Sequence, residues 1–279
     1  MLNVKNRIVA IVGTATLCLL IHSVEPAQAY EDCTANLFLD RYKRVLPIPL
    51  PTLCASDAFS ASDAYAFQEK FGASINDTLA GYKLALTGPL LFGATEPIYG
   101  RLYSAMLRGD NVKIQLADFV KPMLELEIAY TFAADVPPAV TLADLPGYIA
   151  TLAPAAELPD LFFDNPAKLG WKDIIALNAG ARQVVIGKAI EPGSIDVNGL
   201  TLSAHHEGKL VTQGNTGKNI WGNQWQALLF LVEKLNERGY QIRKGNVAIS
   251  GTVSPMVPVE RGHYTFDYGP LGTLQFQVE

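Results

Sequence analysis

The chain has 279 residues, of which 49% are hydrophobic and 18% are charged, and its formal net charge is −5. This mild acidity argues against a nucleic acid as the partner. A chain of this length can form one large domain, or a core with a smaller cap.

The first 29 residues have the pattern of a secretory signal peptide. Lys5 and Arg7 form a short basic region, an apolar run covers residues 8–21, and Ala27-Gln28-Ala29 matches a small-x-small cleavage site. The run is shorter than the ~20 apolar residues that a membrane span needs. We therefore expect cleavage after Ala29, no membrane anchor, and a periplasmic or secreted protein. Losing two cations and one acid with the leader would take the net charge from −5 to −6.

Cleavage would leave two cysteines, Cys33 and Cys54. An even pair in an oxidising compartment favours a disulfide, and two buried free thiols are the alternative. Neither cysteine has a histidine or cysteine partner at zinc-binding spacing.

The amino-acid composition of the N-terminal third of the mature chain changes near residue 60. Residues 30–58 are rich in proline and suit an extended arm, so we assign residues 30–80 to an N-terminal arm or cap and 81–279 to the catalytic domain. Ser60-Ala-Ser-Asp63 resembles a capping box, and a helix is predicted from there to about Phe71. Residues 81–87 are predicted to form a buried strand that carries one lysine, Lys83.

The rest of the chain indicates a β-rich core with a few packed helices. Residues 136–154 contain several prolines and alanines and are expected to form a loop and a short helix. Asp173 is expected to cap a helix that runs to about Ile186. Apolar residues at helical spacing predict a helix over 225–235 that ends before Gly239, and residues 247–278 alternate as strands do.

The strand predicted over residues 122–130 has an unusual polar face. Leu124, Leu126 and Ile128 alternate with Glu125 and Glu127, so the two carboxylates share one face. Two like charges at this spacing repel unless water solvates them or a cation lies between them. The face is therefore either a solvated strand surface or part of a site for an oxygen-preferring divalent ion such as Mg2+, which would need a third ligand from elsewhere.

Several motifs occur in a fixed order along the chain. They are Asp63-Ala-Tyr-Ala-Phe-Gln68, Gly81-Tyr-Lys83-Leu-Ala-Leu-Thr87, Pro97-Ile-Tyr-Gly100, the Glu125-x-Glu127 strand, Gly251-Thr-Val-Ser-Pro-Met-Val-Pro-Val259 and Gly269-Pro-Leu-Gly272. As a set they resemble the 2-keto-4-pentenoate hydratase and 4-oxalocrotonate decarboxylase branch of the fumarylacetoacetate hydrolase superfamily. The resemblance covers the chain from about residue 60 to its end.

The resemblance implies an α+β fold, with a mixed β-roll core, flanking helices and a small N-terminal cap. It also implies a Mg2+ or Mn2+ ion held by three carboxylates. Two of these are Glu125 and Glu127, and the third is Glu157 in the segment Glu157-Leu-Pro-Asp160, with Asp160 as the alternative. Lys83 matches the family's lysine, and we expect it to act as general acid and base, with a pKa lowered by burial. Thr252 is expected to bind the substrate carboxylate.

The family chemistry implies a small-molecule 2-oxo acid substrate, a metal-stabilised enolate and addition of water, in a homo-oligomeric hydratase. Three departures leave the substrate and the reaction open: residues 178–181 read Asn-Ala-Gly-Ala where Ala-Ser-Ser commonly follows the asparagine, Gly222-Asn223-Gln224 replaces Gly-Asn-Pro, and the chain carries a leader. A decarboxylase, an acylpyruvate-type C–C hydrolase and a non-catalytic exported protein that binds an oxo acid are the alternatives.

Overall fold

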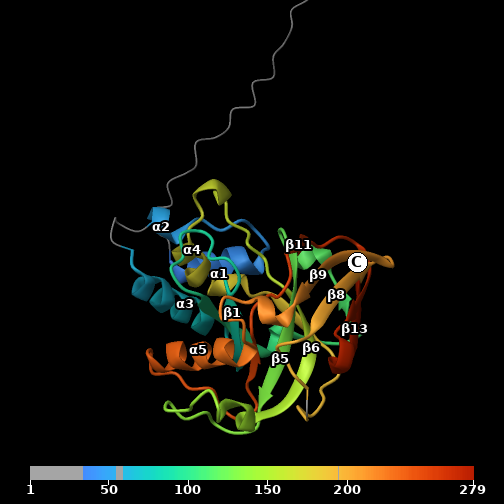
Figure 1. Ribbon diagram of the computed structural model, residues 1–279. Helices are drawn as coiled ribbons and strands as arrows, with labels where there is room; N and C mark the ends of the chain where they lie inside the picture. Colours follow the sequence, from blue (N-terminus) through green and yellow to red (C-terminus); the bar gives the residue numbers. More distant parts are fainter. Residues whose placement is uncertain (1–33, 55–58, 194) are drawn as a thin grey trace, which may run out of the picture.

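The computed structural model describes residues 34–54, 59–193 and 195–279 (Figure 1). The predicted signal peptide and Cys33 lie outside these residues, so the leader and the disulfide remain predictions. In the described part, no helix is both long enough and apolar enough to cross a membrane.

Three helices precede the sheets and pack on the upper part of the molecule in Figure 1. They are α1 (Ala35–Lys43), α2 (Pro51–Cys54) and α3 (Ala61–Ile75), and together with α4 (Trp171–Ala176) they enclose a cluster that includes Phe38, Phe71 and Ile175. The predicted capping box is confirmed, because Ser60 and Asp63 bond reciprocally at the start of α3. Asn76, with a left-handed φ of 55°, ends the helix.

The main sheet has eight strands in the order β2-β1-β10-β5-β6-β7-β3, with β11 paired to β5. The bounds are β1 (Leu79–Ala85), β2 (Ile98–Tyr103), β3 (Leu107–Gly109), β5 (Met123–Phe132), β6 (Ile149–Leu158), β7 (Gln183–Ile186), β10 (Val247–Ile249) and β11 (Val257–Pro258). Both parallel and antiparallel pairs occur, as a mixed sheet requires.

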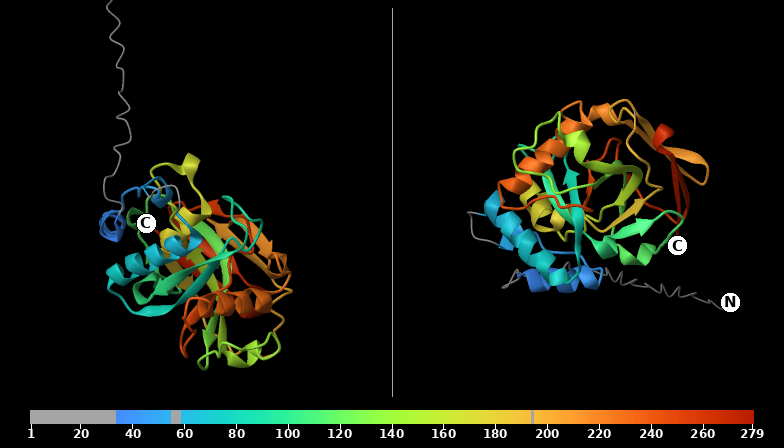
Figure 2. Two further views of the ribbon diagram at one scale, coloured as in Figure 1. Left: turned by 90° about the vertical axis from the view of Figure 1, so that its left-hand side faces the viewer. Right: turned by 90° about the horizontal axis from the view of Figure 1, so that it is seen from below.

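The sheet is rolled rather than flat. Strands β2 and β3 lie at opposite ends of the strand order, yet only the short helix η1 (Ser104–Met106) joins them. The two ends of the sheet must therefore lie close together, and the view from below shows the strands curving around a common centre (Figure 2). The predicted mixed β-roll of an α+β fold is confirmed.

A second sheet and one long helix complete the core. The second sheet has the order β4-β13-β12-β8-β9, with β4 (Lys113–Ile114), β8 (Thr201–His206), β9 (Lys209–Asn215), β12 (Gly262–Asp267) and β13 (Thr273–Val278). Leu124, Leu126 and Ile128 on β5 are fully buried in the cluster that also contains Tyr264 and Phe276. The predicted helix over 225–235 is confirmed as α5 (Gln224–Asn236).

Short helices make most of the remaining connections. They are η2 (Leu116–Asp118), η3 (Leu145–Tyr148), η4 (Pro166–Lys168), η5 (Asn178–Gly180), η6 (Thr216–Lys218) and η7 (Gly269–Leu271).

Two predicted elements are wrong. Residues 149–154, expected in a loop and a short helix, are the first half of β6, where Ala153 and Pro154 pair with β5. The helix expected from Asp173 to Ile186 ends at Ala176, and residues 183–186 form β7. Asp173 does cap α4, since its carboxylate accepts a hydrogen bond from the Gly170 backbone N–H.

Candidate active site

The two faces of β5 and β6 carry different side chains because neighbouring residues on a strand point to opposite faces. The leucines of β5 face the large core, whereas the opposite face carries glutamates and small alanines. Register places Glu125 opposite Glu157 and Glu127 opposite Ala155. Directly opposed residues share a face, so Glu157 joins the Glu125–Glu127 pair inside the roll.

Three carboxylates meet at this point. One oxygen from each of Glu125, Glu127 and Glu157 lies within 4.8 Å of the others. Glu127 and Glu157 are 0% exposed, and Glu125 is partly buried. The solvated strand face that the sequence left open is therefore wrong.

Two buried carboxylate oxygens in this cluster lack a hydrogen-bond donor. Among the described residues, Oε1 of Glu127 and Oε2 of Glu157 are buried without a hydrogen-bond partner, whereas Oε1 of Glu157 lies 2.6 Å from Nζ of Lys83. Oε2 of Glu127 accepts one bond of 2.7 Å, from the Gly251 backbone N–H. Buried carboxylates are normally paired or bound to a metal, so the free oxygens call for a cation.

Burial shifts the acidity of the cluster. Burial is the main reason that the pKa of Glu125 rises to about 8; Lys83 opposes the rise and Glu157 adds to it. Burial also raises the pKa of Glu127 well above its usual range, and the charges of Glu157 and Glu125 reinforce this effect. Removing negative charge from water, next to other negative charge, favours the protonated form.

Lys83 supplies the positive charge in this cluster. The side chain is 1% exposed, and its Nζ lies 2.6 Å from Oε1 of Glu157 and donates a 3.1 Å hydrogen bond to the carbonyl of Ala179. The lowered pKa expected from the sequence is wrong. Burial alone would lower the pKa of Lys83, but the charges of the three glutamates outweigh it and raise the pKa above its ordinary value.

The segment that presents the Ala179 carbonyl has an unusual backbone. Asn178, Ala179 and Gly180 have φ angles of 55°, 53° and 69°, a left-handed run that L residues rarely adopt. The buried Asn178 side chain holds this run against β2: its Oδ1 accepts from the Arg101 N–H at 2.7 Å and its Nδ2 donates to the Arg101 carbonyl at 2.8 Å. Sequence reasoning noted Asn178 only as part of a departure and missed this function.

Gly251 and Thr87 close the site beside Glu127. Gly251 has φ +90°, and a Cβ built there would lie 2.1 Å from the Thr87 hydroxyl. Thr87 is 1% exposed, and its hydroxyl has no hydrogen-bond partner among the described residues. Both residues stand in motifs that carry the family resemblance, but the sequence assigned neither of them a function; the signal for Gly251 was its position directly before Thr252.

The two remaining residues named from the sequence lie differently. The Thr252 hydroxyl bonds within its own turn, since it donates to the Ser254 carbonyl at 3.0 Å. Both oxygens of Asp160 accept backbone bonds of 2.8 Å, from Val120 and Lys121, so Asp160 anchors the chain before β5. Glu157, and not Asp160, is the third carboxylate of the cluster.

These observations fit a divalent metal ion. Three carboxylates can each offer one oxygen to a common centre, and hard cations such as Mg2+ prefer oxygen ligands. The buried oxygens without donors are the atoms that such an ion would bind.

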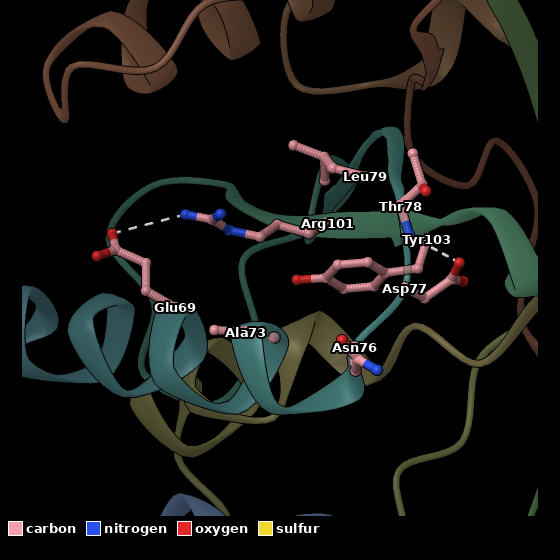
Figure 3. Close-up of a pocket in the computed structure, with 9 residues that line it drawn as sticks. Glu69, Ala73, Asn76, Asp77, Thr78, Leu79, Arg101 and Tyr103 are labelled. Carbon is pink, nitrogen blue, oxygen red and sulfur yellow. Dashed lines mark hydrogen bonds and ion pairs between the residues drawn. The ribbon is translucent and has the colours of Figure 1, made fainter.

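A separate cavity of about 550 Å3 lies beside α3 and β2, and the three glutamates are not among its lining residues (Figure 3). The Glu69 carboxylate in its wall pairs with Arg101 at 3.7 Å and with Arg238 at 3.0 Å. Asp77 at its rim accepts backbone bonds from Thr78 and Ala105. The cavity is therefore separate from the carboxylate cluster.

The chain is similar to known proteins both in sequence and in fold. The chain is 29% identical over 254 residues to a 2-keto-4-pentenoate hydratase from Paraburkholderia phymatum, which covers 88% of this chain and 95% of that protein. The structure of 4-oxalocrotonate decarboxylase from Pseudomonas putida G7, complexed with magnesium and adipate, superposes with a TM-score of 0.82 at 23% identity, over 88% of this chain and 95% of that one. No established family profile matches the chain.

More distant structures share the core of this fold. Fumarylpyruvate hydrolase from Pseudomonas aeruginosa, solved with Mn2+ and pyruvate, has a TM-score of 0.58 at 13% identity and covers 73% of this chain and 91% of that one. The fold is the one that these solved structures share. The sequence is similar to 2-keto-4-pentenoate hydratases and to a 4-oxalocrotonate decarboxylase, as the motifs predicted. Several of the curated homologues are hydro-lyases by name.

Proposed function

We propose that the protein is an exported, metal-dependent hydratase that acts on a 2-hydroxydienoate or 2-oxo-enoate. The observation that carries this proposal is the buried cluster of Glu125, Glu127 and Glu157 with Lys83 at 2.6 Å from Glu157. A solvated surface would not bury Glu127 and Glu157 completely and leave an oxygen of each without a donor. The homologues' names add support for a 2-oxo acid as substrate.

In this proposal Glu125, Glu127 and Glu157 hold the metal, Mg2+ or Mn2+. A bound divalent ion supplies a Lewis acid that stabilises negative charge on the keto oxygen of a 2-oxo acid as the enolate forms. The carboxylates that hold the ion would also determine where the substrate keto oxygen binds. They lie on paired strands of the roll, and the Gly251 N–H donates a hydrogen bond to one of them.

Lys83 is the proposed general acid and base. Its Nζ is held between Glu157 and the Ala179 carbonyl, so the ammonium is oriented before the substrate binds. With a 2-hydroxydienoate it would give a proton to the terminal carbon and take the enol O–H proton. With the resulting 2-oxo-enoate it would give a proton to the carbon beside the keto group and take one from the water that adds at the conjugated position. Thr252 is the proposed contact for the substrate carboxylate, which requires its hydroxyl to leave the bond with Ser254.

Location and assembly complete the proposal. The basic residues Lys5 and Arg7, the apolar run and the Ala27-Gln28-Ala29 site support cleavage after Ala29 and a periplasmic or secreted enzyme. N-terminal sequencing of the protein purified from the cell envelope tests this. A homo-oligomer and a Cys33–Cys54 disulfide are also proposed, and size-exclusion chromatography and thiol titration test them.

The first test of function is calorimetry with Mg2+ and with oxalate, a stable mimic of the chelating end of a 2-oxo acid. We expect oxalate to bind only when Mg2+ is present, and Glu125→Gln to abolish this binding. The exposed Glu260 lies outside the cluster, so Glu260→Gln is the matched control and should bind as the wild type does. If no metal-dependent binding is found, the enzyme assignment fails; if it is found, the products formed from 2-hydroxydienoates distinguish hydration from decarboxylation.

A further inference from the structure

Three loop segments meet next to the carboxylate cluster. We call residues 86–95, 219–226 and 250–259 the rim segments. The Ile220 N–H donates to the Thr87 carbonyl at 2.7 Å, Thr87 packs on Gly251, and the Gly251 N–H binds Glu127. The third segment then runs along β5 past Glu125, since Val253 bonds to Leu126 and Val257 pairs with Leu124.

The rim segments expose large apolar side chains. Eight such side chains are exposed in the described part of the chain, and five of them belong to these segments: Leu90 at 40%, Leu91 at 50%, Phe92 at 38%, Ile220 at 46% and Met256 at 37%. Because five of the eight belong to three segments that are joined beside Glu127, this concentration indicates a binding role.

The same segments contain no charged residue. None of residues 86–95, 219–226 and 250–259 is aspartate, glutamate, lysine, arginine or histidine. Among the neighbours in sequence, Glu96 is paired with Lys234 at 3.0 Å, and Lys218 is exposed. A second carboxylate at the far end of a substrate would therefore find no cation on the rim segments with which to pair. Removing an unpaired charge from water is unfavourable, so such a substrate should bind more weakly.

We infer that the site selects 2-oxo acids with an uncharged, apolar tail and discriminates against those with a second carboxylate at the far end. This inference rests on the proposed function, in which the cluster and Lys83 take the 2-oxo acid end. The tail then extends past Thr87 and Gly251 to the rim side chains, of which Ile220 and Met256 belong to the segments in contact with the site.

The test is calorimetry of the Mg2+-loaded protein with oxalate, 2-oxobutanoate, 2-oxohexanoate and 2-oxoadipate. The last two have the same chain length and differ only in the terminal carboxylate. We expect affinity to rise about fourfold for each methylene buried between 2-oxobutanoate and 2-oxohexanoate. We expect 2-oxoadipate to bind at least about tenfold more weakly than 2-oxohexanoate.

A charge placed on the rim should reverse the preference. In Ile220→Lys, 2-oxoadipate should gain affinity and 2-oxohexanoate should lose it. Leu210 on β9 is 55% exposed and lies outside the rim segments, so Leu210→Lys is the matched control and should change neither.

The outcomes separate the two proposals. Absence of metal-dependent oxalate binding overturns the proposed function itself. Normal oxalate binding together with equal or tighter binding of 2-oxoadipate than of 2-oxohexanoate overturns only the inference about the tail. If Ile220→Lys dissociates an oligomer and leaves the ligand preference unchanged, the rim is an interface between copies of the chain, and the inference is also wrong.

Discussion

Gly251→Ala should damage both the stability and the metal site, because Gly251 has no room for a side chain. The new Cβ would lie 2.1 Å from the Thr87 hydroxyl and 2.6 Å from the Thr87 methyl carbon, both on a buried side chain. A Cβ at this positive φ costs about 1–2 kcal/mol, and overpacking a core typically costs about 1–3 kcal/mol. We therefore expect the free energy of unfolding to fall by about 2–5 kcal/mol, a large part of the ~5–15 kcal/mol typical of a domain.

The assay is urea unfolding of the metal-free protein, followed by Mg2+ titration of the folded variant. Moving the Gly251 N–H away from Glu127 should weaken Mg2+ binding at least about tenfold. Gly147 is the control, since a Cβ there would meet nothing within 4 Å and its φ is not positive, so Gly147→Ala should change stability by less than about 1 kcal/mol. If Gly251→Ala unfolds within about 1 kcal/mol of the wild type, the close packing of Thr87 on Gly251 is wrong.

Three further predictions concern the charge cluster. Glu127→Gln should abolish metal binding and turnover while the metal-free protein melts at the same or a higher temperature, because the amide replaces a buried carboxyl whose ionised form is unfavourable there; a lower melting temperature would contradict this. The pKa of Glu125 is raised to about 8 in the folded protein, so ionisation of Glu125 destabilises the fold. The free energy of unfolding of the metal-free protein should therefore fall by up to about 1.4 kcal/mol per pH unit as the pH rises from about 4.5 to 8. Urea unfolding measures this, and a free energy of unfolding that rises over this range would refute the prediction. Lys83→Met removes the cation 2.6 Å from Glu157, so turnover should disappear. The free energy of unfolding of the metal-free protein, measured by urea unfolding, should fall by about 3–5 kcal/mol. An unchanged free energy of unfolding would show that the ion pair does not stabilise the fold.

The sequence was most informative where a local rule and the tertiary structure agree. Alternation in residues 122–130 correctly separated the buried leucines from the glutamates, because β5 is a regular strand with one face on the core. The Ser60 capping box is a local pattern and predicted the start of α3. Glu157 came from the family resemblance and not from the chain's own pattern, since nothing local relates it to Glu125, which it faces across a strand pair.

The sequence failed where distant residues decide the outcome. Strand β6 contains four alanines and Pro154, residues disfavoured in strands, yet it pairs with β5 along its length. On its other side, Leu152 pairs with Ile190 and residues 155–158 pair with β7. The helix after Asp173 ends early because the following left-handed run is held by Arg101, about 75 residues away in sequence. The direction of the Lys83 pKa shift depends on three glutamates that only folding brings together.

The contact between Asn178 and Arg101 has a consequence for solubility. Strand β2 is the last strand on its side of the sheet order, so its outer N–H and carbonyl groups could pair with a strand of another molecule if side chains did not bond them, as Tyr65 and Gln68 bond Tyr99. The Asn178 amide occupies both groups of Arg101 as a neighbouring strand would. The turn that presents a carbonyl to Lys83 therefore also blocks strand addition at this position, and variants that loosen it should aggregate as well as lose activity.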